Sequence, residues 1–202
     1  MTFEIFLSLA IFSFVTSITP GPNNIMLLTS GVNFGTRRTL PHFAGVNIGI
    51  FLLFLFIGLG LGQIFTLYPQ LYMLMKIAGI LYFIYLAWKI IRSTPPEDSE
   101  NDTAKPITFI EAVLFQWVNP KALLVAASYF SSYTPPDSGS GMIITMSIIY
   151  GIINAPCIGV WVLGGSNLRR YLHNQTYFYA FNWTMAILLI LSLMPIVFST
   201  HL

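Results

Sequence analysis

Hydrophobic residues along this chain gather into six long apolar segments separated by short polar stretches. A membrane-spanning helix needs ~20 such residues, each adding ~1.5 Å. The second, third, fifth and sixth segments have about that length, whereas the first is too long for one straight helix. The pattern predicts an all-α, integral membrane protein with six transmembrane helices, over residues 3–32, 40–62, 71–91, 107–133, 142–163 and 177–198.

Composition supports this membrane environment. Hydrophobic residues make up 55% of the 202-residue chain and charged residues only 8%, against about 25% charged in soluble domains. A soluble fold of this size cannot bury so much apolar surface, so the lipid bilayer is an expected partner. The formal charge of +2 without a basic cluster indicates no nucleic-acid partner. One cysteine and three scattered histidines indicate no metal site, and no cofactor is expected.

Lysine and arginine occur in alternate connections between the apolar segments. The connections after the first, third and fifth segments are basic, whereas residues 63–70 and 134–141 contain neither Lys nor Arg. Because basic connections of membrane proteins stay in the cytoplasm, both termini are expected on the opposite, outer side.

One polar, low-complexity stretch, residues 93–106, divides the chain nearly in half and reads as a solvated cytoplasmic linker. It separates residues 1–92 from residues 107–202 within one membrane domain. Each half then contains three spans. An odd number per half requires a repeated half to insert upside down, so we expect an inverted 3+3 repeat.

Proline interrupts the first apolar segment of each half. The sequence TPGPNN lies at residues 19–24, and Asn119-Pro120-Lys121 lies in the fourth segment. A backbone group freed by proline has no water to bond in hydrocarbon, so a broken helix persists only beside protein or a wet cavity. Matched breaks in the first and fourth helices therefore indicate the binding site of a transporter.

The first break is expected to be shaped by Pro20, Gly21 and Pro22, with Pro22 suited to the first position of a new helix. The free N–H groups of a helix start, followed here by Asn23 and Asn24, suit a carboxylate. An alternative is a structural kink in which the asparagine side chains bond the freed carbonyls. The sequence leaves both open.

The second break carries Lys121. By helical rise the residue lies ~21 Å from the cytoplasmic edge and ~18 Å from the outer edge, too far to reach water easily. Its ammonium then needs a partner or a wet cavity, in which Asn119 would join it and Pro120 would shape the break. In the alternative, residues 107–118 form an interfacial helix and Lys121 reaches the cytoplasmic surface.

Four further polar residues are candidates for the transport pathway. Lys76 and Glu111 lie within about two turns of predicted helix ends and alternatively reach the interface. Asn47 and Asn154 lie inside apolar spans, where they face a cavity or bond a neighbouring helix.

Three short sequences resemble the LysE/RhtB family of amino-acid exporters: TPGPNN at residues 19–24, GILYFIYLAW at residues 79–88 and NPK at residues 119–121. The resemblance extends over essentially the whole chain. The strings KPITF at residues 105–109 and YLAWKI at residues 85–90 are most similar to the cysteine/O-acetylserine branch.

The resemblance implies a secondary transporter in the bacterial inner membrane that exports amino acids by alternating access, driven by H⁺ or another ion. We expect Asn23, Asn24, Asn119 and Lys121 to contact the substrate. Because the spans contain almost no acids, small neutral substrates are favoured, either cysteine/O-acetylserine-like or homoserine/threonine/leucine-like. A homodimer is left open.

Two other kinds of function fit the sequence less well. A membrane enzyme would need a nucleophile, metal or carboxylate constellation, and the sequence has none. A membrane scaffold or channel subunit explains the spans but not a lysine beside a proline break. An exporter of another small solute also remains an alternative.

Overall fold

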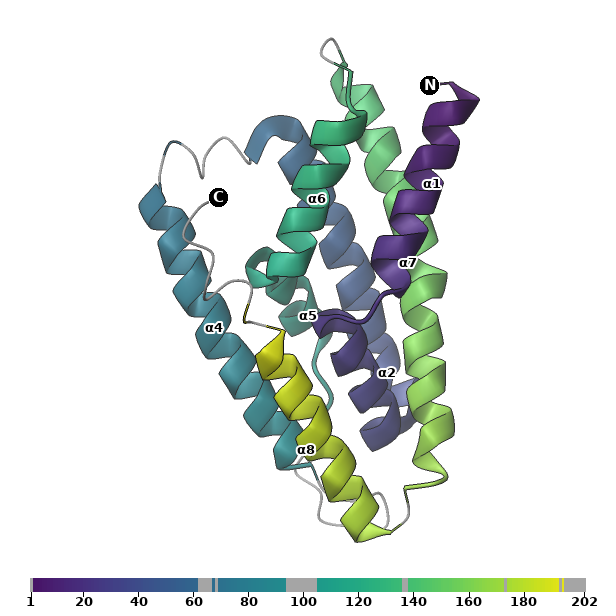
Figure 1. Cartoon of the computed structure of the whole chain (residues 1–202), viewed down its shortest axis with the longest axis vertical. Coiled ribbons are helices and arrows are strands. Elements are labelled where there is room, and N and C mark those ends of the chain that lie inside the picture. Colours follow the sequence, from purple (N-terminus) through teal and green to yellow (C-terminus); the bar gives the residue numbers. More distant parts are fainter. Residues whose placement is uncertain are drawn as a thin grey trace.

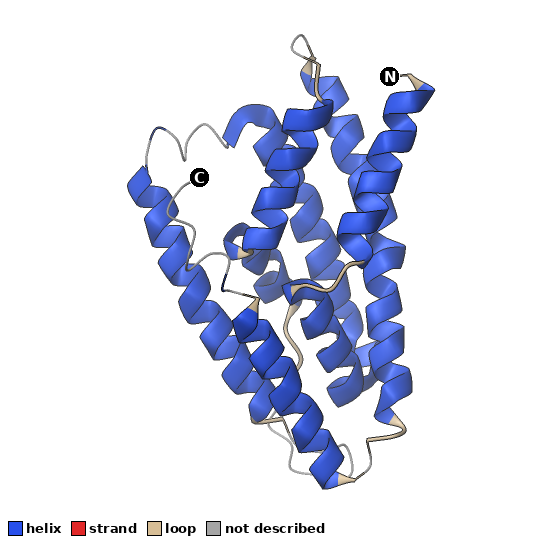
Figure 2. Ribbon diagram, in the orientation of Figure 1, coloured by secondary structure: helices blue, strands red, loops and turns tan. Residues whose placement is uncertain are grey.

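The computed structural model describes residues 2–61, 67, 69–93, 105–135, 138–172, 174–192 and 194, and every regular element in these ranges is a helix (Figures 1 and 2). The predicted all-α class is confirmed; most of the predicted linker, residues 94–104, lies outside the described residues. In chain order the elements are α1 (Phe3–Ile18), α2 (Pro22–Phe56), η1 (Ile57–Leu61), α4 (Pro69–Ile91), α5 (Phe109–Phe115), η3 (Gln116–Val118), α6 (Pro120–Tyr133), α7 (Ser140–Arg169) and α8 (Gln175–Leu191).

The first predicted interruption is present. Helix α1 ends at Ile18, and α2 starts with Pro22 as its first residue. Proline fits that position because the first amides of a helix have no intrahelical acceptor to lose. Gly21, the N-cap residue, is fully extended (φ −179°, ψ 179°), so the chain leaves α1 and enters α2 through a short extended stretch.

Helix α2 consists of two helices joined by a reversal at Gly35. This glycine has φ 73° and ψ 171°, a conformation that residues with a Cβ rarely adopt. The hydroxyl oxygens of Ser30 and Thr39 lie 3.0 Å apart, although nine residues of straight helix would separate them by ~13 Å. Residues 22–34 are therefore a half-helix that continues α1 beyond the break, and residues 36–56 run back alongside it (Figure 1).

The returning helix starts earlier than the predicted segment at residue 40. Gly35 makes the turn alone, so the polar residues that follow it are already helical. Thr39 is fully buried there, where its hydroxyl donates to the Gly35 carbonyl at 2.8 Å.

The second interruption is sharper and shorter. The segments Phe109–Val118 and Pro120–Tyr133 meet at 64°, and Asn119 (φ −82°, ψ 108°) alone separates η3 from α6. A capping box fixes the start of α5: the Thr108 amide donates to Glu111 Oε2 at 2.7 Å, and the Glu111 amide donates to Thr108 Oγ1 at 3.2 Å.

The helices pack around two apolar clusters. The first joins α1, residues 36–56, α6 and α7, with Phe54 and Tyr129 among its fully buried side chains. The second attaches α4 and α8 to the half-helix at residues 22–34 and to α5, with Met26 and Phe83 in its centre. Figure 1 shows α4 and α8 side by side, inclined to α1, α6 and α7.

Three described helices are long and apolar enough to cross a membrane: Pro22–Leu61, Met73–Ile91 and Ser140–Arg169. The first of these includes the reversal at Gly35. The bent pair formed by α5, η3 and α6 counts as a fourth when taken as one broken span, and α1 is a shorter apolar helix of 16 residues.

Basic residues of the three basic connections meet at one end of the helices. A Cβ atom at Gly35 would lie 2.8 Å from Nη1 of Arg169, and Phe34, Lys89 and Lys105 line one cavity. In Figure 1 this end holds the end of α7 and the start of α8, opposite the start of α1. The alternation of basic connections thus corresponds to two ends of the folded chain.

Candidate functional site

The carbonyls freed at the first break are bonded by side chains. The Nδ2 of Asn24 donates to the Ser17 and Thr19 carbonyls, both at 2.8 Å, and Nε1 of Trp161 donates to the Ile18 carbonyl at 3.2 Å. Groups from α2 and α7 therefore replace the hydrogen bonds that a continuous helix would have supplied.

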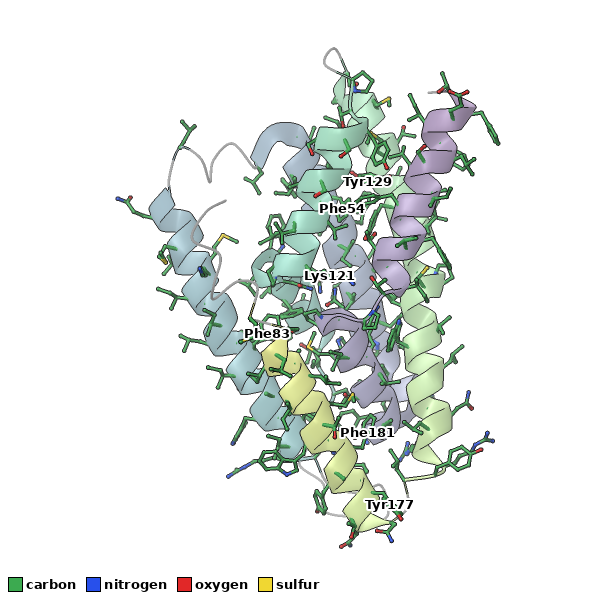
Figure 3. The ribbon with its side chains drawn as sticks, viewed as in Figure 1. Phe54, Phe83, Lys121, Tyr129, Tyr177 and Phe181 are labelled. Atoms are coloured by element: carbon green, nitrogen blue, oxygen red, sulfur yellow. The ribbon has the colours of Figure 1, made fainter. Side chains whose placement is uncertain are left out.

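Lys121 joins the second break to the first. Its Nζ donates to the Thr19 carbonyl at 2.9 Å, to Thr19 Oγ1 at 3.0 Å and to the Pro20 carbonyl at 3.3 Å. Figure 3 shows Lys121 in the middle of the molecule, far from both ends of the helices. The ammonium is thus directed inward to the first break, as the buried interpretation predicted, and not to the basic end.

Two helix N-termini face this region. Helix α2 begins at the N-cap Gly21 and α6 at the N-cap Asn119, each is followed by proline, and neither has a side-chain cap. The first backbone bonds of these helices are made by the amides of Ile25 and Leu123. The amides before them lack an intrahelical acceptor and carry the partial positive charge of a helix start.

These groups surround an open cavity of about 390 Å³. Its polar lining comes from both breaks and from α1 and α7: Thr16, Ser17, Asn23, Asn24, Asn119, Lys121, Tyr150 and Asn154. Asn119 is 1% exposed, and its Oδ1 has no hydrogen-bond partner among the described residues. A buried carbonyl oxygen without a donor is costly, and a ligand with an N–H or O–H group would satisfy it.

Asn23 lines the cavity but is already paired. Its Nδ2 donates to Oε1 of Gln116 at 2.8 Å, and Nε2 of Gln116 donates back to Asn23 Oδ1 at 3.1 Å. Gln116 also donates to the Ala112 carbonyl at 2.9 Å. This reciprocal amide pair connects the half-helix at residues 22–34 to the turn before the second break.

Asn154 also lines the cavity, and its Nδ2 donates to Oδ1 of Asn47 at 2.8 Å. Beside it, the hydroxyl of Tyr150 lies 3.1 Å from Thr16 Oγ1 and accepts from Ser17 Oγ at 3.4 Å. The far wall of the site is therefore a polar network between α1 and α7.

The remaining pathway candidates do not line the central cavity themselves. Asn47, Lys76 and Glu111 are not among the residues that line this cavity. Glu111 forms the capping box of α5, and Lys76 is half-buried on α4. The structure therefore brings together all four predicted substrate-contact residues and Asn154. Asn47 lies behind Asn154, to which it is hydrogen-bonded, whereas Lys76 and Glu111 are not part of the lining.

Several residues of the site were missed by sequence reasoning, including the polar side chains that α1 contributes to the lining. Gln116 is a polar residue in an apolar run four positions before Pro120, which is a usable signal. Tyr150 and Trp161 reach the site from α7, and neither has a local sequence feature that marks it. Only contact between distant parts of the chain reveals their place.

Chemically, the cavity combines one ammonium, two uncapped helix starts and one unpartnered carbonyl oxygen. The first two attract an anionic group, and the last accepts a hydrogen bond from a donor. Within the described residues no group of three His, Cys, Asp or Glu side chains is placed to hold a metal ion.

Comparison with known proteins gives consistent relatives. The chain is 30% identical over 181 residues to the cysteine/O-acetylserine efflux proteins of Escherichia coli strain K12 and of Shigella flexneri, covering 89% of this chain and 90% of each relative. The protein of the same name from Escherichia coli O1:K1 is 29% identical over the same length. No solved structure matches the chain.

The model of the LysE type translocator family matches residues 14–200, which include both breaks and the whole cavity. A multi-pass membrane protein with several apolar helices fits that family. Family and relatives alike indicate a transporter and not an enzyme. On these grounds the chain belongs to the family of LysE type translocators.

Proposed function

We propose that this protein exports small neutral amino acids, of the cysteine/O-acetylserine type, from the bacterial cytoplasm across the inner membrane. The observation that carries the proposal is the bond from Lys121 Nζ to the Thr19 and Pro20 oxygens beside two uncapped helix starts. The names of the relatives supply the substrate class.

The amino-acid carboxylate would bind Lys121 and the free amides at the starts of α2 and α6. To reach it, the ammonium of Lys121 has to give up bonds to the Thr19 and Pro20 oxygens. Substrate binding would then loosen the contact between the two breaks. Such a change of partner is a physical means of coupling occupancy to alternating access.

The substrate's own ammonium requires acceptors. Asn119 Oδ1 is available, and the freed carbonyls would become available once Lys121 moves. Among the described residues no carboxylate lines the cavity. A second positive charge, as in lysine or arginine, would therefore remain unneutralised, which favours neutral substrates.

The proposed topology has six spans. Residues 3–34, broken at Thr19–Gly21, form the first span, and residues 107–133, broken at Asn119, form the fourth. Each restarts with proline at the first helical position, and this shared feature supports an inverted repeat of two three-span halves. The end with the basic residues would face the cytoplasm and both termini the periplasm, with H⁺ as the coupling ion.

The proposal is tested by efflux from cells preloaded with a panel of labelled amino acids. Wild type and Lys121→Ala are compared at equal membrane abundance, with Arg92→Ala, an exposed residue at the end of α4, as the control. We expect selective efflux of small neutral amino acids from wild type and control, and background efflux from Lys121→Ala.

Equal efflux from all three variants would remove Lys121 from the mechanism. Efflux of no amino acid above that of cells without the protein would favour a scaffold, a channel subunit or an exporter of another solute.

A further inference from the structure

A second cavity, of about 400 Å³, lies at the basic end of the helices. Its walls are the half-helix at residues 22–34, the last turns of α4 and the residues just before α5. Lys89 and Lys105 line it together with Asn33, and no described carboxylate does. Lys105 belongs to the predicted cytoplasmic linker, residues 93–106.

The two cavities lie along the same half-helix. Pro22 and Asn23 line the central cavity, whereas Met26, Ser30 and Asn33 line the second one. The latter three are spaced four and three residues apart and therefore share one face. One helical turn separates Pro22 from Met26, ~6 Å along the axis.

An apolar barrier separates the two cavities. Met26 is 3% exposed and packs in the cluster that contains Phe83, Leu86 and Phe115. Along the half-helix, Met26 lies between the residues that line the central cavity and the deeper polar residues that line the second one, so a polar solute that moves along this helix would pass this cluster. In the topology proposed above, the second cavity lies on the cytoplasmic side of the central one, from which an exporter takes its substrate.

Two side-chain hydroxyls that line the second cavity, those of Thr29 and Ser30, can still accept hydrogen bonds. Thr29 Oγ1 donates to the Ile25 carbonyl at 2.8 Å. The Thr39 hydroxyl already donates its hydrogen bond to the Gly35 carbonyl, so Ser30 Oγ is the donor in the 3.0 Å contact between Ser30 and Thr39. The hydroxyl oxygens of Thr29 and Ser30 thus retain lone pairs but no free proton.

Asn33 gives a second indication that this cavity binds a ligand. It is 6% exposed, it lines the cavity, and its Oδ1 has no hydrogen-bond partner in the described chain. The central cavity has the same feature in Asn119, likewise a buried asparagine oxygen without a donor beside a lysine. Each cavity therefore offers a lysine ammonium and an unsatisfied amide oxygen, without a described acid.

We propose that the second cavity is a cytoplasmic loading site for the same α-amino acids, occupied before the substrate crosses the apolar barrier to the central site. Lys89 and Lys105 would bind the carboxylate, and Asn33 Oδ1 with the hydroxyl oxygens of Thr29 and Ser30 would accept from the ammonium. This inference rests on the proposed function, because it assigns a second position to the substrate named there.

An anionic lipid head group is the competing ligand for a basic cavity at a membrane surface. The buried positions of Asn33, Ser30 and Thr29 (6%, 5% and 2% exposed) on the face that leads to the central cavity favour the amino acid. The ligand needs both an anion and a hydrogen-bond donor, which an α-amino acid combines within a few ångströms.

The test is the binding stoichiometry of L-[³⁵S]cysteine, kept reduced, to the purified protein in phosphatidylcholine nanodiscs. The loading-site variant is Asn33→Leu/Lys89→Gln/Lys105→Gln, and the matched control is Arg92→Gln/Arg170→Gln, which removes two exposed charges from the same end. We expect two cysteines per wild-type and control chain, one per loading-site variant, one per Lys121→Ala, and none when the two changes are combined.

Transport from the cytoplasmic face gives a second readout. In inside-out vesicles the loading-site variant should raise the KM for cysteine about tenfold, equivalent to ~1.4 kcal/mol of binding, while kcat changes less than about twofold. The Lys89→Arg/Lys105→Arg variant, which keeps both charges, should restore the wild-type KM.

One cysteine per wild-type chain, lost entirely in Lys121→Ala and unaffected in the loading-site variant, would overturn the loading site and leave the proposed function standing. An effect of the loading-site variant that appears only with phosphatidylglycerol in the nanodiscs would assign the cavity to lipid. That result would also overturn the proposed loading site. Binding and transport of no amino acid by any variant would refute the proposed function itself.

Discussion

The two helix breaks differ in how their polar groups are satisfied. At the first, carbonyls of Ser17, Ile18, Thr19 and Pro20 all accept hydrogen bonds from side chains of other elements. At the second, Asn119 alone separates two helices, and its buried Oδ1 has no donor. At the first break the protein itself supplies donors to the freed carbonyls. At the second break one buried oxygen has no donor and is left to accept a hydrogen bond from a ligand.

This difference separates structural from binding roles among residues of the same type. Asn24 and Asn119 are both buried asparagines that line the central cavity. Asn24 donates to two carbonyls, so its replacement should lower the stability of the fold. Replacement of Asn119 should instead weaken substrate binding. Lys121 has both a structural and a binding role, because its ammonium donates to the Thr19 carbonyl at the first break and supplies the positive charge of the central cavity.

The largest effect is expected from Gly21→Val, which would break the contact between the two regions. A Cβ at Gly21 would lie 2.7 Å from Cδ and 3.0 Å from Nζ of Lys121, so a branched side chain must displace the lysine. The extended backbone at Gly21 accepts valine without strain. We expect efflux to fall about 100-fold or more, from the loss of several charge-assisted hydrogen bonds.

Gly139→Val is the matched control. Gly139 is likewise an extended N-cap glycine, at the start of α7, and no heavy atom lies within 4 Å of its added Cβ. Its efflux should remain at the wild-type level. Wild-type efflux from Gly21→Val would show that Lys121 is not needed where the structure places it.

Asn24→Leu should act on stability. The variant leaves the buried Ser17 carbonyl without its donor and removes one donor from the Thr19 carbonyl. An unsatisfied buried acceptor costs about 1–3 kcal/mol. We expect a lower thermal unfolding midpoint in detergent and lower membrane abundance, with the KM of the remaining protein close to wild type.

Asn119→Leu should show the opposite signature. Since Oδ1 has no partner in the described chain, its replacement costs no internal hydrogen bond. The unfolding midpoint should stay the same or rise, while the KM for export increases about tenfold from the loss of one bond to a charged ligand group. A lowered midpoint with unchanged KM would reverse the roles assigned to the two breaks.

The smallest effect is expected from Glu111→Ala. The carboxylate closes the capping box of α5, one helix before the second break, and it does not line the central cavity. Loss of a cap costs about 0.5–2 kcal/mol. We expect a slightly lower unfolding midpoint and an efflux rate within about twofold of wild type. An efflux rate reduced to background would indicate instead that Glu111 takes part in the transport pathway.

Local sequence features predicted much of this arrangement. Proline has no N–H group and tolerates only certain helix positions, so TPGPNN and Asn119-Pro120-Lys121 marked both breaks and Pro22 as a helix start. The distance of Lys121 from water favoured a buried partner for it. The order of apolar segments and the alternation of basic connections gave the helical class and the two ends of the molecule.

The partners of these groups could not be predicted, because they are far apart in the chain. Asn23 pairs with Gln116, 93 positions away, and Tyr150 reaches Thr16 from 134 positions away. The reversal at Gly35 was also missed, since a single glycine made a turn that the apolar pattern placed across several polar residues. Such contacts depend on how helices pack, which hydrophobic periodicity does not specify.

The central claim, that Lys121 holds the substrate carboxylate, is tested most directly by comparing cysteine with cysteamine, which lacks the carboxylate. The measurement is the concentration of each compound that halves transport of labelled cysteine into inside-out vesicles, for wild type and for a Lys121→Gln variant with enough residual transport to assay. We predict that wild type prefers cysteine by about 100-fold and that the variant loses at least tenfold of this preference. An equal preference in both proteins would contradict the claim.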